Sequence, residues 1–241
     1  MSGSSEPLPH SQTLARGIRV LEVLAEAGHP LSIAELAAAI GVHRSVAYRI
    51  LRTLEDFKLV ARNTSGAVQL GARLGELSHS VSRDLQAAAL PELTALAQEL
   101  TMTSFLTILE GSEVVILTSV EPRHQAATIL YRPGSRHPVT QGAPGIAMQT
   151  LIDDALWEKL ALGAPRRAEV HKVEEHGYIT TRGEVIRGMA ATAVPLAVPQ
   201  EGPAALAVVY VESERTESDV GARLSAAARR IESAFSRQSA A

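Results

Sequence analysis

Residues 32–54 read Ser-Ile-Ala-Glu-Leu-Ala-Ala-Ala-Ile-Gly-Val-His-Arg-Ser-Val-Ala-Tyr-Arg-Ile-Leu-Arg-Thr-Leu, and this stretch decides the fold. Ser32 stands three residues before Glu35, which is the spacing of a capping box at the start of a helix. Gly41 ends that helix, and a second helix follows in which apolar residues recur at helical spacing. The pattern predicts two helices joined by a glycine turn, a helix-turn-helix.

The second helix of this pair has two chemically different sides. The apolar residues that follow the i, i+3, i+4, i+7 pattern, and predict its buried side, are Ala47, Ile50, Leu51 and Leu54. The opposite side carries hydroxyl and guanidinium groups on Ser45, Tyr48, Arg49 and Arg52, with Arg44 at one edge. A helix of this shape and chemistry fits the major groove of DNA.

Positive charge is local to this region. The whole chain of 241 residues has a net charge of -3, which argues against a surface that binds nucleic acid everywhere. Between Gly41 and Arg62, however, five basic residues stand against two acidic ones. A solvated amphipathic surface is the usual explanation of a charged helical face. The capping box, the glycine turn and the local charge together favour DNA binding.

Flanking segments complete a small domain around the helix pair. Leu14 to Ala25 shows helical spacing that stops at Gly28-His29-Pro30, and Leu59 to Arg62 and Ala67 to Leu70 read as short strands around a turn-rich tip. Three helices followed by a hairpin predict a winged helix over residues 11–70. Residues 1–10, rich in Ser, Gly and Pro, are expected to be a disordered leader.

The remainder of the chain changes its periodicity. Residues 71–90 have helical character and predict a linker helix, which Pro91 interrupts before a new helix begins. The strands expected in residues 91–241 are 104–110, 113–120, 127–131, 190–198 and 204–211. Helices are expected at 146–151, 154–162, around 169–176, and at 220–235. This order predicts an α+β domain built on an antiparallel sheet.

The composition and motifs of the chain exclude several classes of function. The chain has no cysteine, no apolar stretch long enough for a membrane span and no signal-peptide pattern, so we expect a cytoplasmic protein without a membrane partner. The eight histidines are scattered, and no nucleophile elbow or phosphate-binding glycine loop occurs. We therefore expect no catalytic site, no metal and no cofactor.

The chain resembles the IclR family of bacterial transcriptional regulators from about residue 11 to residue 235. The N-terminal segments that carry the resemblance are Arg16-Gly17, Pro30-Leu31-Ser32, Ala34-Glu35-Leu36-Ala37, Gly41-Val42, Tyr48-Arg49-Ile50-Leu51, Leu54-Glu55 and Gln69-Leu70-Gly71. Those in the second half are Glu184, Gly188, Ala193-Val194-Pro195 and Ala205 to Val211. The resemblance implies a winged helix-turn-helix, a linker helix and a GAF-like effector-binding domain that supports homodimers or homotetramers.

Three positions depart from the family pattern. Ile146 stands where the family usually carries lysine in its pocket-forming loop, and Val46 replaces the usual threonine of the recognition helix. His43 stands where proline or a small residue is common.

Two sets of residues are predicted to bind ligands. The DNA-binding set is Ser32, Arg44, Ser45, Tyr48, Arg49, Arg52, Arg62, Asn63 and Thr64. Arg44 and Arg49 are assigned to guanine, Arg52 to the DNA backbone, and the start of the Ser32 helix to a phosphate. By analogy with the family, the effector-binding set is Gly142, Ala143, Met148, Thr192, Val194, Val209 and Val211.

These observations predict a regulator that binds a double-stranded DNA operator under the control of a small-molecule effector, either an organic acid or an aromatic metabolite. One alternative is a constitutive DNA-binding protein whose C-terminal domain only oligomerises. A more distant one is a small-molecule enzyme fused to a winged helix, which the missing catalytic motifs weaken.

Overall fold

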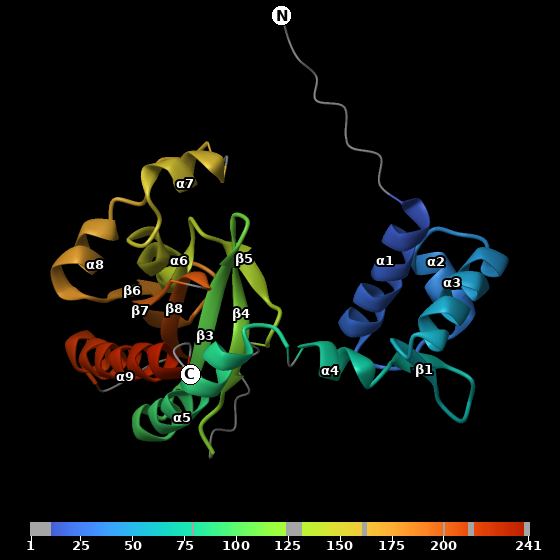
Figure 1. Cartoon of the computed structure of the whole chain (residues 1–241), viewed down its shortest axis with the longest axis horizontal. Coiled ribbons are helices and arrows are strands. Elements are labelled where there is room, and N and C mark those ends of the chain that lie inside the picture. Colours follow the sequence, from blue (N-terminus) through green and yellow to red (C-terminus); the bar gives the residue numbers. More distant parts are fainter. Residues whose placement is uncertain are drawn as a thin grey trace, which may run out of the picture. The chain divides into compact units, whose positions relative to one another are not determined.

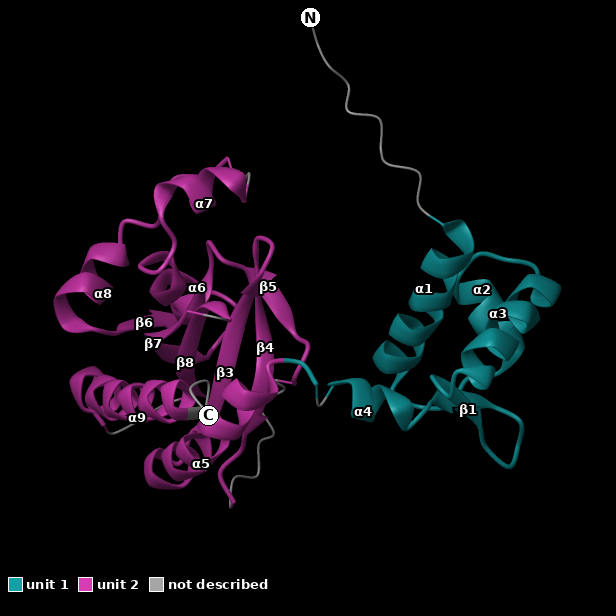
Figure 2. Ribbon diagram, in the orientation of Figure 1, with its two compact units in different colours: residues 1–81 teal, residues 82–241 magenta. Residues whose placement is uncertain are grey.

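Residues 1–81 and 82–241 form two separate structural units, which Figure 2 shows in teal and magenta. The computed structural model describes residues 11–78, 80–123, 132–160, 163–199, 201–211 and 215–238. The strand expected at 127–131 and the leader expected at 1–10 lie outside these ranges. In the described ranges, no helix is both long enough and apolar enough to cross a membrane.

The first unit is a winged helix (Figure 1), and its helices and strands surround a small apolar core. Its elements are α1 (Gln12–Ala27), α2 (Ile33–Ala39), α3 (Arg44–Asp56), β1 (Val60–Arg62), β2 (Val68–Leu70) and α4 (Arg73–Ser78). Ser11 caps α1, and Gly41 takes the left-handed conformation (φ 65°) that turns the chain from α2 into α3. The core joins α1, α2 and α3 to the wing through Val20, Leu24, Leu36, Ile50, Leu51, Leu54, Val60 and Val68.

The wing is a pair of antiparallel strands with a third point of attachment. β1 pairs with β2 from Val60 opposite Leu70 to Arg62 opposite Val68. Leu31, which precedes α2, adds a bridge to Val68 with backbone hydrogen bonds of 2.9 and 2.8 Å. The wing is therefore fixed to the start of the helix-turn-helix.

The second unit is an α+β domain built on an antiparallel sheet, as the sequence predicts, and its elements form three layers. The strands of its sheet are β3 (Thr103–Glu110), β4 (Glu113–Val120), β5 (Arg136–Pro138), β6 (Ile179–Arg182), β7 (Ala190–Val198) and β8 (Gly202–Tyr210). They pair antiparallel in the order β5-β4-β3-β8-β7-β6. The helices are α5 (Arg83–Leu100), α6 (Gly142–Gln149), α7 (Asp154–Lys159), α8 (Val170–His176) and α9 (Glu217–Gln238).

Both faces of this sheet are buried. Helices α5 and α9 pack together on one face, in a core that includes Leu96, Leu106, Leu206 and Leu224. Helix α6 covers the other face, where Ile146 and Met148 meet Phe105. The two central strands, β3 and β8, are consequently buried along most of their length.

The linker differs from its prediction. Instead of one helix over 71–90 that Pro91 ends, the chain forms the short helix α4, takes a left-handed conformation at Ser82 (φ 45°), and then runs as α5 through Pro91. Proline lacks the amide that would bond the carbonyl of Ala87. Ala87 and Pro91 are both exposed, so water can satisfy that carbonyl while Ala88, Ala89 and Leu93 keep the helix packed.

Candidate nucleic-acid interface

Helix α3 presents its polar side to solvent because its apolar stripe is used in the core. Ala47, Ile50, Leu51 and Leu54 are buried, as their spacing predicts. Ser45, Arg49 and Arg52 are exposed on the other side, and half of the Tyr48 side chain is accessible. The structure therefore brings these four predicted residues onto one surface of α3.

Among the residues that the structure describes, three arginines of α3 have no ion-pair partner. Arg44, Arg49 and Arg52 are exposed, and no carboxylate in the described part of the chain pairs with any of them. Arginines on other helices, such as Arg19 and Arg230, do pair with glutamates. Unneutralised guanidinium groups on a solvent-facing helix can fork onto guanine or bind phosphate oxygens without first breaking a salt bridge.

Arg62, which the sequence analysis assigned to DNA, has partners within the protein. Its Nε donates a hydrogen bond to Glu55 Oε1 at 2.5 Å, and its guanidinium carbon lies 5.8 Å from the centre of the Tyr48 ring. This cation–π contact and ion pair connect β1 to α3. Arg62 thus holds Tyr48 in place on the surface of α3 and has part of its own charge neutralised.

The tip of the wing is organised by Asn63. Its Oδ1 accepts hydrogen bonds from the amide of Ser65 (3.0 Å), the hydroxyl of Ser65 (2.7 Å) and the amide of Ala67 (2.9 Å). The carboxamide oxygen is therefore committed to the turn. Thr64 is exposed at the same tip and keeps the predicted place for a DNA contact.

The hydrogen bonds of Ser32 change the predicted phosphate site at the start of α2. Its hydroxyl accepts from the amide of Glu35, and its own amide donates to Glu35 Oε2 at 2.7 Å, which completes the capping box. These hydrogen bonds from Ser32 lower the pKa of Glu35. The start of α2 therefore carries a negative carboxylate at the position where the sequence analysis expected a phosphate to bind.

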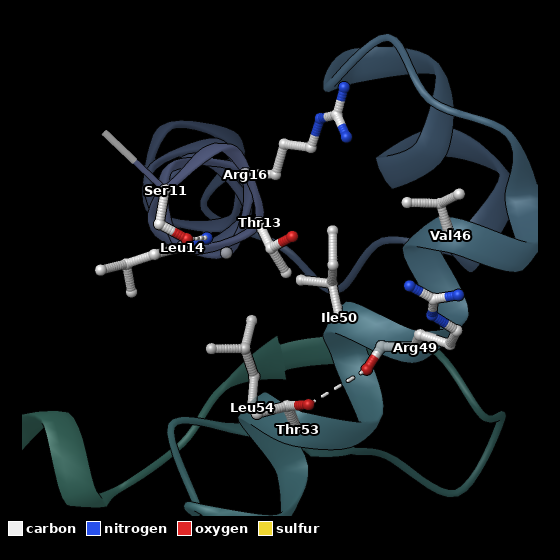
Figure 3. Close-up of a pocket in the computed structure, with 10 residues that line it drawn as sticks. Ser11, Thr13, Leu14, Arg16, Val46, Arg49, Ile50, Thr53 and Leu54 are labelled. Atoms are coloured by element: carbon white, nitrogen blue, oxygen red, sulfur yellow. Dashed lines mark hydrogen bonds between the residues drawn. The ribbon is translucent and has the colours of Figure 1, made fainter. Parts of the chain in front are cut away.

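Arg16 is a candidate that the sequence analysis did not include. It lies with Arg49 and Val46 on a groove of about 560 Å³ between α1 and α3, whose apolar floor includes Ile50 and Leu54 (Figure 3). Arg16 is exposed and unpaired in the described residues. Nothing in the local sequence of α1 links Arg16 to α3, because only the packing of the two helices brings these residues to one groove.

The predicted effector residues lie on different faces of the second unit. Gly142, Ala143 and Met148 of α6 are buried on one side of the sheet, and Val209 of β8 faces them. Thr192 and Val194 face the opposite layer, under α5 and α9. There Thr192 Oγ1 lies 3.2 Å from Tyr210 Oη, and Val194 belongs to the core.

The pleat of the strands explains this correction. Residues two apart in a strand share a face, so Thr192 and Val194 point together away from α6. The residues of β7 that face α6 are Ala191 and Ala193. Val211 follows β8 and is 60% exposed, so it lines neither layer.

A charged network closes the amino end of α6. The amide of Gly142 donates to Glu184 Oε2 at 2.9 Å, and two nitrogens of Arg167 donate to the two oxygens of Glu184 at 3.1 Å each. Arg167 also bonds both oxygens of Glu169 and the carbonyl of Thr140. The cavity that remains beside Gly142 and Glu184 has a volume of about 10 Å³, the space of one water molecule.

Arg167 stabilises the charged forms of both carboxylates. Its hydrogen bond lowers the pKa of Glu169 to about 2. Burial acts to raise the pKa of Glu184, but hydrogen bonds from Arg167 and from the Gly142 amide outweigh it, so the pKa of Glu184 is lowered. A carboxylate with a depressed pKa contributes stability above its unfolded pKa and loses that contribution as the pH falls through the folded pKa.

We expect the stabilisation by Glu169 to disappear between about pH 4.5 and pH 2. Urea unfolding followed by the fluorescence of Trp157, the one tryptophan of the chain, reports on the second unit. At pH 6 the wild type should be more stable than Glu169→Gln, and the difference should shrink as the pH falls through that window. Glu174→Gln, an exposed change in α8, the helix that Glu169 precedes, is the matched control. A difference that stays constant with pH would contradict this account of the network.

An exposed arginine-bearing helix inside a winged helix-turn-helix is the arrangement found in DNA-binding proteins of the helix-turn-helix class. The IclR helix-turn-helix domain matches residues 13–64 of this chain. The chain belongs to the IclR family of transcriptional regulators.

Full-length relatives support this assignment. The "Probable transcriptional regulator SauR" of Cupriavidus necator is 29% identical over 228 residues, which cover 87% of this chain and 90% of the relative. The regulator XynR of Escherichia coli is 28% identical over 206 residues, covering 78% of this chain and 81% of the relative. Both relatives carry names of transcriptional regulators and not of enzymes.

Solved structures share the complete fold. An IclR regulator from Alicyclobacillus acidocaldarius superimposes with a TM-score of 0.76 at 25% identity, covering 94% of this chain and all of the other. An IclR homolog from Microbacterium hydrocarbonoxydans, solved in complex with 4-hydroxybenzoate, gives a TM-score of 0.78 at 23% identity over the same shares of the two chains. Two domains of this type are therefore found together in known proteins.

Proposed function

We propose that this regulator recognises a specific operator by placing α3 in the major groove of DNA. The observation that carries the proposal is the set of three exposed arginines on the outer side of α3, none of which pairs with a carboxylate of the described segments. Arg44 and Arg49 would form bidentate hydrogen bonds with guanine, and Arg52 would bind the backbone. Arg16 and Thr64 add backbone contacts on either side, and Tyr48 is positioned by Arg62.

The active form in this proposal is a two-fold symmetric dimer or a pair of dimers. A symmetric dimer requires an operator with paired half-sites. Helix α4 and the turn that follows it supply apolar surface for such pairing, because Leu77 is 51% exposed and Val81 is 46% exposed. The proposal places the protein in the cytoplasm, where a bacterial operator lies.

A small carboxylate is the proposed effector, and the amino end of α6 is its proposed site. The relative from Microbacterium hydrocarbonoxydans binds 4-hydroxybenzoate, an aromatic carboxylate, on the same fold. In this chain the carboxylate of Glu184 accepts hydrogen bonds from the Gly142 amide and the Arg167 guanidinium. An effector carboxylate would take its place on these two donors, and differential binding to one conformation would then alter operator affinity.

The closed state of the cleft favours a second candidate function. A cavity of about 10 Å³ admits no metabolite unless the segment that carries Glu184 moves. If that segment never moves, the C-terminal unit serves only to oligomerise a constitutive DNA-binding protein.

Ligand titration separates the two functions. We expect a carboxylate from a panel containing 4-hydroxybenzoate and short aliphatic acids to change operator affinity at least fivefold, measured by fluorescence anisotropy, which corresponds to about 1 kcal/mol of coupling. Glu184→Gln should bind the same acid several times more tightly, because the competing charge is gone. Glu174→Gln should match the wild type. A panel without effect on either wild type or Glu184→Gln would support the oligomerisation role.

A further inference from the structure

Two side chains in the first turn of α3 form a pair with a defined hydrogen-bond direction. His43 is the N-cap of α3, and its Nδ1 lies 3.4 Å from the amide nitrogen of Ser45 and 2.9 Å from the hydroxyl of Ser45. Both residues are exposed on the surface that also carries Arg49.

The backbone sets the direction of these hydrogen bonds. An amide N–H can only donate, so the amide of Ser45 requires a lone pair on His43 Nδ1. A neutral imidazole with a lone pair on Nδ1 carries its hydrogen on Nε2. The hydroxyl of Ser45, which lies close to the same Nδ1, must then be the donor in that contact.

A serine hydroxyl has one hydrogen and two lone pairs. Because Ser45 gives its hydrogen to His43, its oxygen can only accept a hydrogen bond from DNA. Phosphate oxygens are acceptors as well, so Ser45 cannot bond them. In the major groove the available donors are the N4 amino group of cytosine and the N6 amino group of adenine.

We infer that His43 is a specificity-determining residue, which fixes Ser45 as a hydrogen-bond acceptor and restricts the base that Ser45 reads to cytosine or adenine. This inference rests on the proposed entry of α3 into the major groove, where the amino-terminal residues of a recognition helix meet base edges. His43 acts through Ser45 and is a positioning residue in this account.

Selection from a random duplex library with the full-length protein tests the inference. The wild-type profile should contain one position per half-site that prefers cytosine or adenine and loses that preference in Ser45→Ala. His43→Ala should relax discrimination at the same position about fivefold, the low end of the usual cost of a mismatched base pair. His43→Asn should restore the preference, since an asparagine Oδ1 can accept from both the amide and the hydroxyl of Ser45.

Two further measurements test the inference: binding to duplexes that contain base analogues, and the position of the proton on the His43 ring. Replacing the preferred base by an analogue without its amino group should weaken wild-type binding and leave Ser45→Ala unaffected. In full-length protein labelled with nitrogen-15 histidine, with His43→Asn for assignment, proton–nitrogen correlations should show His43 protonated on Nε2 and not on Nδ1.

Three results would overturn the inference. They are a Ser45-dependent preference for guanine or thymine, a preference that survives in His43→Ala, and a proton on His43 Nδ1. If His43→Ala lowered affinity equally for all sequences, the residue would be a helix cap alone, and the inference would fail while α3 remained the DNA-binding helix. Failure of the proposed function itself appears separately, as unchanged affinity in Arg49→Ala.

Discussion

Arg49→Ala is expected to lose specific operator binding while the protein stays folded. A bidentate arginine–guanine contact contributes about 1–3 kcal/mol of discrimination, and a symmetric dimer loses it in both half-sites. Arg49 is exposed and has no ion-pair partner in the described residues, so its removal leaves no buried group unsatisfied. Fluorescence anisotropy with the selected operator and with a scrambled duplex measures the effect.

Two arginine variants serve as controls for this result. Arg19→Ala removes an exposed arginine from α1 of the same unit, where it pairs with Glu22 and Glu26, and should bind the operator as the wild type does. Arg52→Ala should weaken binding to both duplexes alike and reduce the salt dependence, as expected for a phosphate contact. Equal affinities of Arg49→Ala and Arg19→Ala would remove Arg49 from the interface.

Leu51→Ala, in contrast to Arg49→Ala, is expected to lower the stability of the first unit. Leu51 lies two residues from Arg49 but on the other side of α3, fully buried between α1, α2 and the wing. Leucine-to-alanine changes in a packed core cost about 2–5 kcal/mol. This is a large share of the stability of a small domain.

Hydrogen exchange by mass spectrometry resolves this loss within the full chain. Peptides from α1, α2 and α3 should exchange at least about thirtyfold faster in Leu51→Ala, the equivalent of about 2 kcal/mol, while peptides from β3 and β8 stay unchanged. Leu14→Ala, at a position 64% exposed in the same unit, is the matched control. Similar exchange in the two variants would show that the apolar stripe of α3 is not in the core.

Local signals were sufficient to predict the winged helix. The spacing of Ala47, Ile50 and Leu51 fixes which side of α3 is buried, and the Ser32–Glu35 spacing fixes where α2 begins. These features depend on residues at most four apart. For the same reason the exposure of Arg49 and Arg52 follows from the sequence.

Features that depend on distant partners could not be predicted in this way. The contacts of Arg62 with Glu55 and Tyr48 arise because the wing folds back onto α3, and no local spacing in the sequence predicts them. Pro91 was expected to end a helix, but packing of Ala88 and Leu93 beneath α9 carries α5 through it. The short edge strands β5 and β6 contain too few apolar residues for a periodic signal.

The effector cleft depends even more strongly on residues that are distant in sequence. Thr192 and Val194 were assigned to the same site as Val209 by analogy with the family, but the register of β7 and β8 determines which face each one occupies. Arg167, Glu169 and Glu184 meet only because the segments that carry them converge at Gly142. Seventeen residues separate Arg167 from Glu184, and no local spacing rule connects them.

Directed cleavage of the operator tests the central claim, that the outer side of α3 lies in the major groove. Because the chain contains no cysteine, Asp56→Cys would provide a single attachment point for an iron chelate that generates hydroxyl radicals. Asp56 is exposed, one helical turn beyond Arg52, and its loss removes no positive charge. Glu26→Cys, exposed on α1, provides the matched label away from α3.

The account predicts strand cleavage from position 56 in two clusters, one within each operator half-site, and much weaker cleavage from position 26. An operator that stays intact with the label at position 56, while the label at position 26 cuts it, would contradict the account.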